Sequence, residues 1–257
     1  MDFSIIITTY KRPAKVRELV DQLLNLPVKP VEIIVVDSSD EINQSLVVIA
    51  GVKYLKSSHK NQPYQRYLGY MASKSEFLVF LDDDMEVVDN QFLKKLEKLF
   101  ENKTIAGIAI RFENKHEDSL LAQMPKSQLF NKSGKIKKAK GWLTGYPELK
   151  PGKFGLCGNR GKQPIGGGET EWLSGGAFAA RRSAMFQNFN FQLFDIFEQK
   201  LGMGEDAIIG YGLSKQGKLI YHDELFFLHN DQRDSTYTMN TFEFARRVSF
   251  SRMYLSL

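Results

Sequence analysis

Four aspartates in the first third of the chain have the type and spacing for metal chemistry. Asp37 follows the apolar run "VEIIVV", and Asp82, Asp83 and Asp84 follow "FLVFL". Three adjacent carboxylates repel one another unless a positive charge lies among them, and hard cations such as Mg²⁺ or Mn²⁺ prefer oxygen ligands. Because these ions complete their shell with phosphate oxygens, the triplet favours a site for a nucleotide diphosphate. A solvated acidic turn that caps the following helix is the alternative.

The elements around these acids place them at one edge of a predicted sheet. Buried-strand patterns cover residues 3–8, 31–37, 52–55, 77–81 and 106–112, and helical patterns cover residues 12–26, 65–73 and 90–100. Strands separated by helices predict a mostly parallel sheet with right-handed crossovers. Such sheets bind ligands beyond the carboxyl ends of their strands, so Asp37 and the aspartate triplet should gather where the ligand binds.

A second acidic pair, Glu205 and Asp206, lies in "GMGEDAIIGYGL" at the start of a predicted helix from Asp206 to Lys215. The helix dipole favours carboxylates there, so helix capping is one explanation. The flanking glycines and the position after "WLSGG" favour a functional one. A carboxylate can act as a general base by taking the proton of an attacking hydroxyl.

Three residues of "EWLSGGAFAARRS" suit a sugar. Gly175 and Gly176 have no side chains, so a sugar can approach their backbone closely. Trp172 offers an aromatic face for the C–H surface of a sugar ring, although a buried core tryptophan is the alternative. Further along, His229 follows the apolar run "LFFL" and should end a late strand, where a purely structural histidine is also expected.

Six motifs together carry a resemblance to a known family. In chain order they are "SIIITTYKRP", "IIVVDSS", "QRYLGYMASKSEFLVFLDDD", "EWLSGGAFAARRS", "GEDAIIGYGL" and "FFLHND". Over roughly residues 3 to 230 the chain resembles the inverting family 2 nucleotide-sugar glycosyltransferases of the GT-A fold. One motif alone would be weak, but six in the family's order are specific. The resemblance implies an α/β fold of GT-A type, Rossmann-like, with a mostly parallel central sheet flanked by helices.

The resemblance also implies roles on the donor side. Thr8 and Tyr10 match positions that surround the nucleoside base and ribose, and Asp37 matches the acid that hydrogen-bonds the base, usually uracil. Arg66 matches a basic residue near the donor pocket. The family often has asparagine where this chain has Tyr67, so the identity of the donor stays open.

The metal ligands follow from the same resemblance. Asp82 and Asp84 occupy the outer positions of the family's DxD signature, and Asp84 matches the direct ligand of Mn²⁺ or Mg²⁺. Asp82 and Asp83 reach the ribose, or the metal through water. His229 matches a third metal ligand that the family frequently places at the end of a late strand.

The implied reaction is metal-dependent transfer of a sugar from a nucleotide diphosphate sugar, with UDP-sugars favoured, to an acceptor hydroxyl with inversion. Asp206 matches the general base, and Glu205 stands beside it in the family's acidic motif. The implied acceptor is a glycan or a lipid-linked molecule, in the synthesis of cell-surface glycans or polysaccharides.

Two other functions remain as alternatives. A sugar-phosphate nucleotidyltransferase shares the sheet and the metal chemistry, but it should carry a glycine-rich loop after the first strand, where this chain has "TTYKRP". A catalytically silent module that binds a sugar nucleotide or a glycan needs no acceptor-side base. The presence of both Asp84 and Asp206 argues against such a module.

Composition limits the remaining possibilities. A chain of 257 residues with 42% hydrophobic residues fits one α/β domain with appendages. Its net charge of +5 is mild, so we expect no nucleic-acid partner. The single cysteine, Cys157, excludes an internal disulfide framework and fits a reducing compartment. Without a signal-peptide pattern or an apolar stretch of roughly 20 residues, we expect a cytoplasmic protein, with peripheral contact at the inner face of the membrane as an option.

We expect two parts in the chain. Residues 1–230 form the GT-A domain, with a nucleotide-sugar-binding half (1–112), a basic insertion (113–170) and an acceptor-side half (171–230). Residues 126–162 hold nine lysines and Arg160 against one acid, which suits a lid over the donor, a dock for an anionic acceptor or a solvated loop. Residues 231–257 form an amphipathic basic appendage that suits anionic lipid or a partner protein, although we prefer that it covers the sheet of its own domain.

Overall fold

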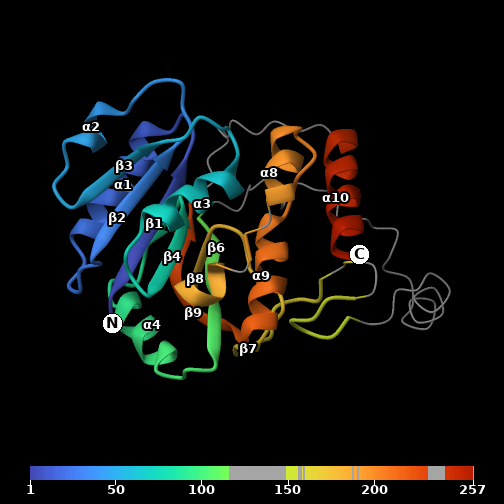
Figure 1. The fold of residues 1–257 in the computed structure, drawn as a ribbon. Helices are drawn as coiled ribbons and strands as arrows, with labels where there is room; N and C mark the ends of the chain where they lie inside the picture. Colours follow the sequence, from blue (N-terminus) through green and yellow to red (C-terminus); the bar gives the residue numbers. More distant parts are fainter. Residues whose placement is uncertain are drawn as a thin grey trace.

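The structure is a computed structural model that describes residues 1–115, 149–155, 158, 160–186, 188–189, 191–230 and 241–256. Within these ranges one sheet has the strand order β3-β2-β1-β4-β8-β6-β9-β5, with β7 paired to β9 (Figure 1). The strands are β1 (Phe3–Thr9), β2 (Glu32–Asp37), β3 (Val52–Lys56), β4 (Phe77–Asp82), β5 (Met85–Val87), β6 (Ile105–Asn114), β7 (Gly168–Glu169), β8 (Ala177–Arg181) and β9 (Lys218–His229). The helices are α1 (Pro13–Leu24), α2 (Gln44–Val47), α3 (Gln62–Ala72), α4 (Phe92–Phe100), α7 (Arg182–Phe186), α8 (Phe191–Glu198), α9 (Glu205–Gln216) and α10 (Thr241–Ser256).

The sheet consists of two parallel blocks joined by one reversed strand. Strands β3, β2, β1 and β4 are parallel, and so are β6 and β9. Strand β8 lies between β4 and β6 and is antiparallel to both, so the two blocks run in the same direction. The short strands β5 and β7 pair antiparallel with β9. The predicted α/β fold with a mostly parallel sheet is therefore confirmed.

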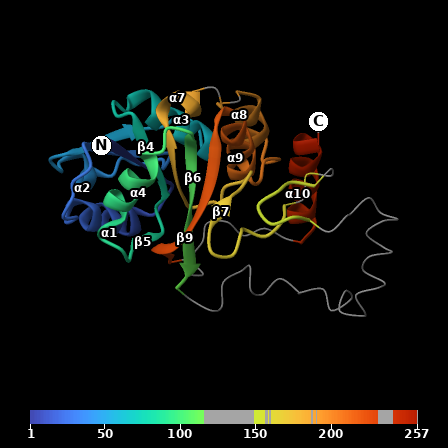
Figure 2. The same cartoon turned by 90° about the horizontal axis from the view of Figure 1, so that it is seen from below.

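Alternating side chains of the central strands build a core on each face of the sheet. Ile5 and Ile7 of β1 pack with α1 and α4, whereas Ile6 points to the other face with residues of α3, α7 and α9. Strand residues alternate between the two faces of a sheet, so a run of isoleucines buried on both sides marks a central strand. Figure 2 shows α1 and α4 on one side of the sheet and α9 on the other.

Helix α3 begins three residues earlier than its apolar pattern predicts. The side chain of Asn61 caps it by accepting a hydrogen bond from the backbone N–H of Tyr64 at 3.1 Å, and Pro63 lies in the first turn. Asparagine caps and early prolines are both typical helix starts. The longer helix brings Gln62 and Arg66 onto the same element, next to the end of β4.

Several expectations concern residues that the structure does not describe. Residues 116–148 of the basic insertion and residues 231–240 before the last helix lie outside the described ranges.

Helix α10 lies beyond α8 and α9, away from the sheet (Figures 1 and 2). The preferred expectation that this segment covers the sheet is therefore wrong, because α9 already occupies that face. Among the helices in the described ranges, none combines the length and apolarity needed to cross a membrane.

Candidate active site

The carboxyl ends of β1, β2 and β4 bring the first acidic residues together. In the register of the sheet, Thr9 of β1 lies beside Asp37, and Thr8 lies beside Asp82. Because β1 is the strand between β2 and β4, all these residues reach the same edge. Asp37 and Asp82 thus lie at the same end of the sheet, as expected.

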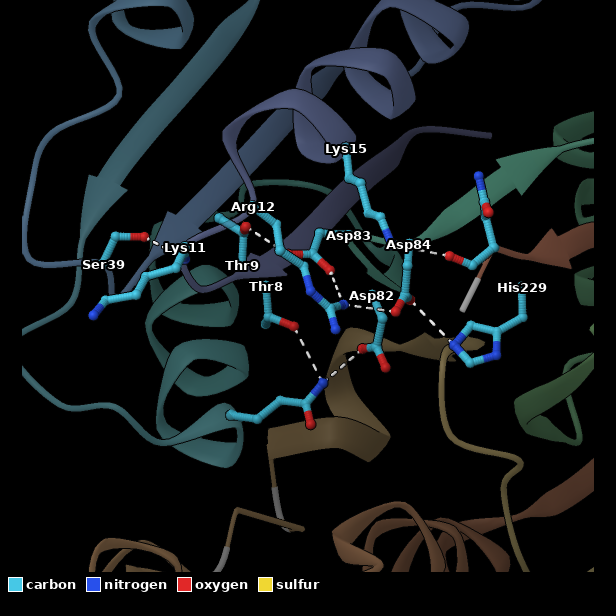
Figure 3. Close-up of polar contacts among 12 residues, drawn as sticks. Thr8, Thr9, Lys11, Arg12, Lys15, Ser39, Asp82, Asp83, Asp84 and His229 are labelled. Carbon is cyan, nitrogen blue, oxygen red and sulfur yellow. Dashed lines mark hydrogen bonds and ion pairs between the residues drawn. The ribbon is translucent and has the colours of Figure 1, made fainter. Parts of the chain in front are cut away.

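Asp83 is held inside the protein rather than presented at the edge. Its Oδ2 accepts a hydrogen bond from the Thr9 hydroxyl at 2.6 Å, and its Oδ1 accepts one from Arg12 Nη1 at 3.0 Å. Burial, together with the charge of neighbouring Asp84, raises the pKa of Asp83 to about 6. Figure 3 shows Arg12 reaching from the turn after β1 to both Asp83 and Asp84. Asp83 thus fixes that turn, and its predicted contact with the donor stays a prediction.

Asp84 and His229 face each other across the end of the sheet (Figure 3). Asp84 Oδ2 accepts a hydrogen bond from Arg12 at 2.7 Å, whereas its Oδ1 is buried, makes no hydrogen bond and lies 3.3 Å from His229 Nε2. His229 Nδ1 lies 3.0 Å from the side-chain oxygen of Asn114. An amide oxygen only accepts, so in this contact His229 Nδ1 donates to Asn114, and Nε2 faces the Asp84 carboxylate.

A carboxylate oxygen and an imidazole nitrogen this close to each other need a proton or a cation between them. Neighbouring ligands of an octahedral Mg²⁺ ion with bonds of about 2.1 Å lie about 3 Å apart, close to the observed separation. The Asn114 contact is the kind that orients a metal-ligating histidine. The described residues contain no group of three or more His, Cys, Asp or Glu side chains that could hold a metal. A carboxylate and an imidazole are a donor set that Mn²⁺ or Mg²⁺ accepts, and phosphate and water would fill the other positions.

Arg66 joins the donor edge to the second acidic pair. Its side chain is 2% exposed, donates to Asp82 Oδ1 at 3.1 Å and donates to Glu205 Oε1 at 2.7 Å. Burial acts to lower the pKa of Arg66, but the charges of Glu205 and Asp82 outweigh it and raise that pKa. Burial raises the pKa of Glu205 to about 7, against the effect of Arg66. Arg66 thus lies near the donor edge, as expected, but between the two acidic groups.

Gln62 adds a second link at the donor edge. Its side-chain amide donates to Asp82 Oδ1 at 2.7 Å and to the Thr8 hydroxyl at 3.3 Å. Gly176 also contributes, because its carbonyl accepts from the backbone N–H of Asp82 at 2.8 Å. Gly176 has a φ of +99°, and a Cβ there would come within 2.4 Å of Met85 Cε. The glycine is therefore required by the fold, in addition to its predicted role toward a sugar.

Asp206 is buried beside Glu205, and its carboxylate faces a half-exposed arginine. Its Oδ2 is 3.5 Å from Arg160 Nη1, and the Arg160 guanidinium lies 4.9 Å from the centre of the Trp172 ring. Gly175 faces the same carboxylate, since a Cβ built on it would be 3.6 Å from Asp206 Oδ2. The N-cap residue of α9 is Gly204, without a side-chain cap bond. The four residues Asp206, Trp172, Gly175 and Arg160 thus share one corner of the site.

Asp37, the carboxylate predicted to bind the nucleoside base, already accepts two hydrogen bonds from the protein. Asp37 Oδ2 accepts from the Tyr54 hydroxyl at 2.6 Å, and Oδ1 accepts from the backbone N–H of Ser39 at 2.7 Å. Burial, followed by the hydrogen bond to Asp37, raises the pKa of Tyr54 to about 12. Each carboxylate oxygen can accept a second bond, so contact with a base stays a prediction. Tyr10 lies nearby, with the ammonium of Lys60 5.5 Å from its ring centre.

Sequence reasoning missed three residues that shape the site: Arg12, Gln62 and Arg160. Arg12 had a visible signal, because it follows the first strand and a positive charge was expected among the aspartates. From the sequence, that positive charge is attributed to a metal ion, and an arginine is not considered. Gln62 lies just before the predicted start of its helix, and Arg160 carried no signal beyond the basic composition of its segment.

Comparisons with known proteins place the chain in a family and a fold. A family model described as "Glycosyl transferase family 2" matches residues 4–160, more than half of the chain. A comparison with curated proteins gives no match. The crystal structure of S. aureus TarS 1-349 in complex with UDP-GlcNAc has a TM-score of 0.59 and 18% identity, over 93% of this chain and 62% of that one.

A second solved structure has a similar fold. Glucosyl-3-phosphoglycerate synthase from Mycobacterium tuberculosis, in complex with Mn²⁺, UDP-glucose and phosphoglyceric acid, has a TM-score of 0.50 and 12% identity, over 98% of this chain and 76% of that one. At such identities the likeness is one of fold. This chain spans only about 60% of the length of TarS 1-349.

Proposed function

The chain belongs to glycosyl transferase family 2, and from that premise we propose that it transfers a sugar from a nucleotide diphosphate sugar to an acceptor hydroxyl. One observation carries the proposal: Arg66 bridges Asp82 at the donor edge and Glu205, the neighbour of Asp206, at the acceptor side. Sugar transfer needs a site for the departing diphosphate and, a short distance away, a group that takes a proton. UDP-sugars are the favoured donors, because the TarS and glucosyl-3-phosphoglycerate synthase structures hold UDP-sugars.

The donor binds beyond the ends of β1, β2 and β4. Asp37 accepts a hydrogen bond from the base, and Tyr10 and Thr8 lie along the nucleoside. Asp82 contacts the ribose, and its position is supported by the hydrogen bonds from Gln62 and Arg66. This assignment leaves the far side of the edge, near Asp84, for the diphosphate.

Asp84 and His229 hold Mn²⁺ or Mg²⁺ in the proposed complex. The bound ion supplies positive charge that stabilises the negative charge developing on the leaving diphosphate. The proposal is supported by the buried Asp84 Oδ1 without a hydrogen bond and by its distance of 3.3 Å to His229 Nε2. Arg12 balances the charge of Asp83 and Asp84 at the same place.

The transfer itself is a single displacement. The acceptor oxygen forms a bond to the anomeric carbon from the face opposite the diphosphate, and the bond from that carbon to the phosphate oxygen breaks. Asp206 takes the proton of the acceptor hydroxyl, and the nucleoside diphosphate leaves with the bonding electron pair. The configuration at the anomeric carbon is inverted, and no second carboxylate is needed as a nucleophile.

Glu205 and Asp206 have different roles on the acceptor side. Glu205 is fixed by Arg66 at 2.7 Å and serves to position the start of α9, which leaves Asp206 as the base. Trp172, Gly175 and Gly176 border the space for the sugar and the acceptor. A glycan or lipid-linked acceptor in cell-surface polysaccharide synthesis is the setting that we propose, and α10 remains a candidate for contact with a membrane or a partner.

A screen of nucleotide sugars tests the function. The protein is incubated with each nucleotide sugar and Mn²⁺, and the released nucleoside diphosphate is measured. We expect UDP release from one or a few UDP-sugars, and loss of that release in Asp84→Ala. If no nucleotide sugar is cleaved while a sugar phosphate and UTP yield pyrophosphate, the nucleotidyltransferase reading is correct instead. Binding of a nucleotide sugar without any turnover would support a silent binding module.

A further inference from the structure

Arg160 is the cation beside Asp206, and it differs from the other arginines of the site. Its side chain is 39% exposed, and its Nη1 lies 3.5 Å from Asp206 Oδ2, at the outer limit of a hydrogen bond. Arg66, by contrast, is buried and makes two shorter contacts. Arg160 is the exposed partner of this pair and holds Asp206 only at the limit of a hydrogen bond, so its guanidinium remains accessible to another anion.

The stacking on Trp172 prepares Arg160 for such an exchange. A guanidinium that lies over an aromatic ring keeps its plane fixed and leaves its edge available. Arginine has five N–H donors in a rigid fork that matches the two oxygens of a carboxylate or phosphate. Within the described part of the chain, the Arg160 side chain donates only to Asp206. This contact uses Nη1, one of the several nitrogens of the guanidinium.

The position of Arg160 indicates that an anion bound to its guanidinium would belong to the acceptor. Its side-chain contacts, Asp206 and Trp172, both belong to the acceptor side, whereas the donor-edge acids are bonded to Arg12 and Arg66. The backbone at Gly175 leaves room next to the same carboxylate. An anionic group bound to the Arg160 guanidinium would place a hydroxyl of the same molecule close to Asp206.

We propose that Arg160, supported by Trp172, is an anion subsite for the acceptor, whose substrate class is a hydroxyl compound with a phosphate or carboxylate group. The proposal rests on the function proposed above and names its acceptor class. Binding of the anion draws Arg160 away from Asp206 and leaves that carboxylate to the hydroxyl. A phosphate group could also come from the donor, and the test separates the two sources.

The chain provides its own reporter for this test. It has two tryptophans, Trp142 and Trp172, so Trp142→Phe leaves Trp172 as the single fluorophore under Arg160. The protein is saturated with UDP and Mn²⁺ and titrated with inorganic phosphate, with ionic strength held constant by chloride. We expect a saturable change in fluorescence, with binding weakened at least tenfold by Arg160→Gln. Arg160→Lys, which keeps the charge but loses the fork, should weaken it less.

A matched control comes from the same loop. Lys153 pairs with Glu171 at 3.1 Å, away from Asp206, so Lys153→Gln should bind phosphate as the parent does. Equal phosphate binding in the parent and in Arg160→Gln, or no saturable change, would overturn the proposal. Phosphate that binds only without UDP would assign the anion to the donor and also overturn it.

Donor cleavage separates failure of this inference from failure of the proposed function. UDP-sugar hydrolysis by water needs no acceptor anion, so it is measured in the parent protein and in the control Lys153→Gln, which should cleave the donor as the parent does. If hydrolysis is present and phosphate does not bind, only the subsite is wrong. If no donor is cleaved, the proposed function fails whatever the phosphate titration shows. Calorimetry of phosphate binding repeats the test without the Trp142→Phe background.

Discussion

The two acidic groups of the site are neutralised by arginines in different ways. At the donor edge, Asp83 and Asp84 share Arg12 through bonds of 3.0 and 2.7 Å. In the second acidic pair, Glu205 has the buried Arg66, whereas among the described residues the ion-pair partner of Asp206 is the exposed Arg160 at 3.5 Å. Three of these carboxylates are fixed by their partners, and the fourth is not. A general base must be able to change partners, so the difference in pairing singles out Asp206.

The largest effect should follow from removing that base. Asp206→Asn should lower transfer by about 10²- to 10⁴-fold, the usual contribution of a general base, and leave the affinity for UDP and metal unchanged. Asparagine keeps the shape of the side chain, so the fold should survive. Steady-state transfer and calorimetry with UDP measure the two quantities.

Glu205→Gln is the control, because the two acids are adjacent. It should lower transfer less than Asp206→Asn does. A dead Glu205→Gln beside an active Asp206→Asn would make Glu205 the base, and two active variants would reduce the pair to helix capping.

The next largest effect concerns stability. Arg66→Met leaves Glu205 and Asp82 without their buried partner, and breaking a buried pair on one side costs about 3–5 kcal/mol. Arg160→Met removes an exposed cation and should cost less than about 1 kcal/mol of unfolding free energy. Urea unfolding measures both. Similar losses in the two variants would contradict the contrast between a fixed and an exchangeable arginine.

A smaller effect should appear in the pH dependence of stability. Burial raises the pKa of Glu205 to about 7 in the folded state, above its ordinary value of about 4.3 in an unfolded chain. The folded state therefore holds the proton more tightly, so this stabilisation is complete below about pH 4 and is lost as the pH rises through about 7. Asp83, with a pKa raised to about 6, acts in the same direction.

Glu205→Gln cannot titrate and isolates the contribution of that residue. Relative to this variant, the parent should lose unfolding free energy between pH 5 and pH 8, measured by urea unfolding at each pH. A difference that grows in favour of the parent as the pH rises would show that Arg66 dominates and that the pKa of Glu205 is not raised.

Local patterns predicted the strands and the edge of the site. The apolar runs before Asp37, Asp82 and His229 are continuous in the sequence, and the carboxyl ends of parallel strands meet whatever the details of packing. The reversed strand β8 was expected only as a strand, because its direction depends on a connection that the sequence does not specify. The start of α3 was missed because a cap by Asn61 outweighs apolar periodicity.

The partners of the acids could not be predicted in the same way. Arg66 and Glu205 are separated by 139 positions, and Arg12 and Asp84 by 72. No local pattern links such residues, since the pairing depends on how β1, α3 and α9 pack. The sequence therefore indicated which acids matter, whereas the arginines that distinguish them became visible only in the folded chain.

The central claim is that the donor edge binds a nucleoside diphosphate together with a metal held by Asp84 and His229. Calorimetry of UDP binding with Mn²⁺ and again with EDTA tests it most directly. We expect at least tenfold tighter binding with Mn²⁺, no such gain in Asp84→Ala, and a retained gain in the control Asp83→Asn, since Asp83 is bonded to Thr9 and Arg12. Equal affinity of the parent protein for UDP with Mn²⁺ and with EDTA would contradict the account.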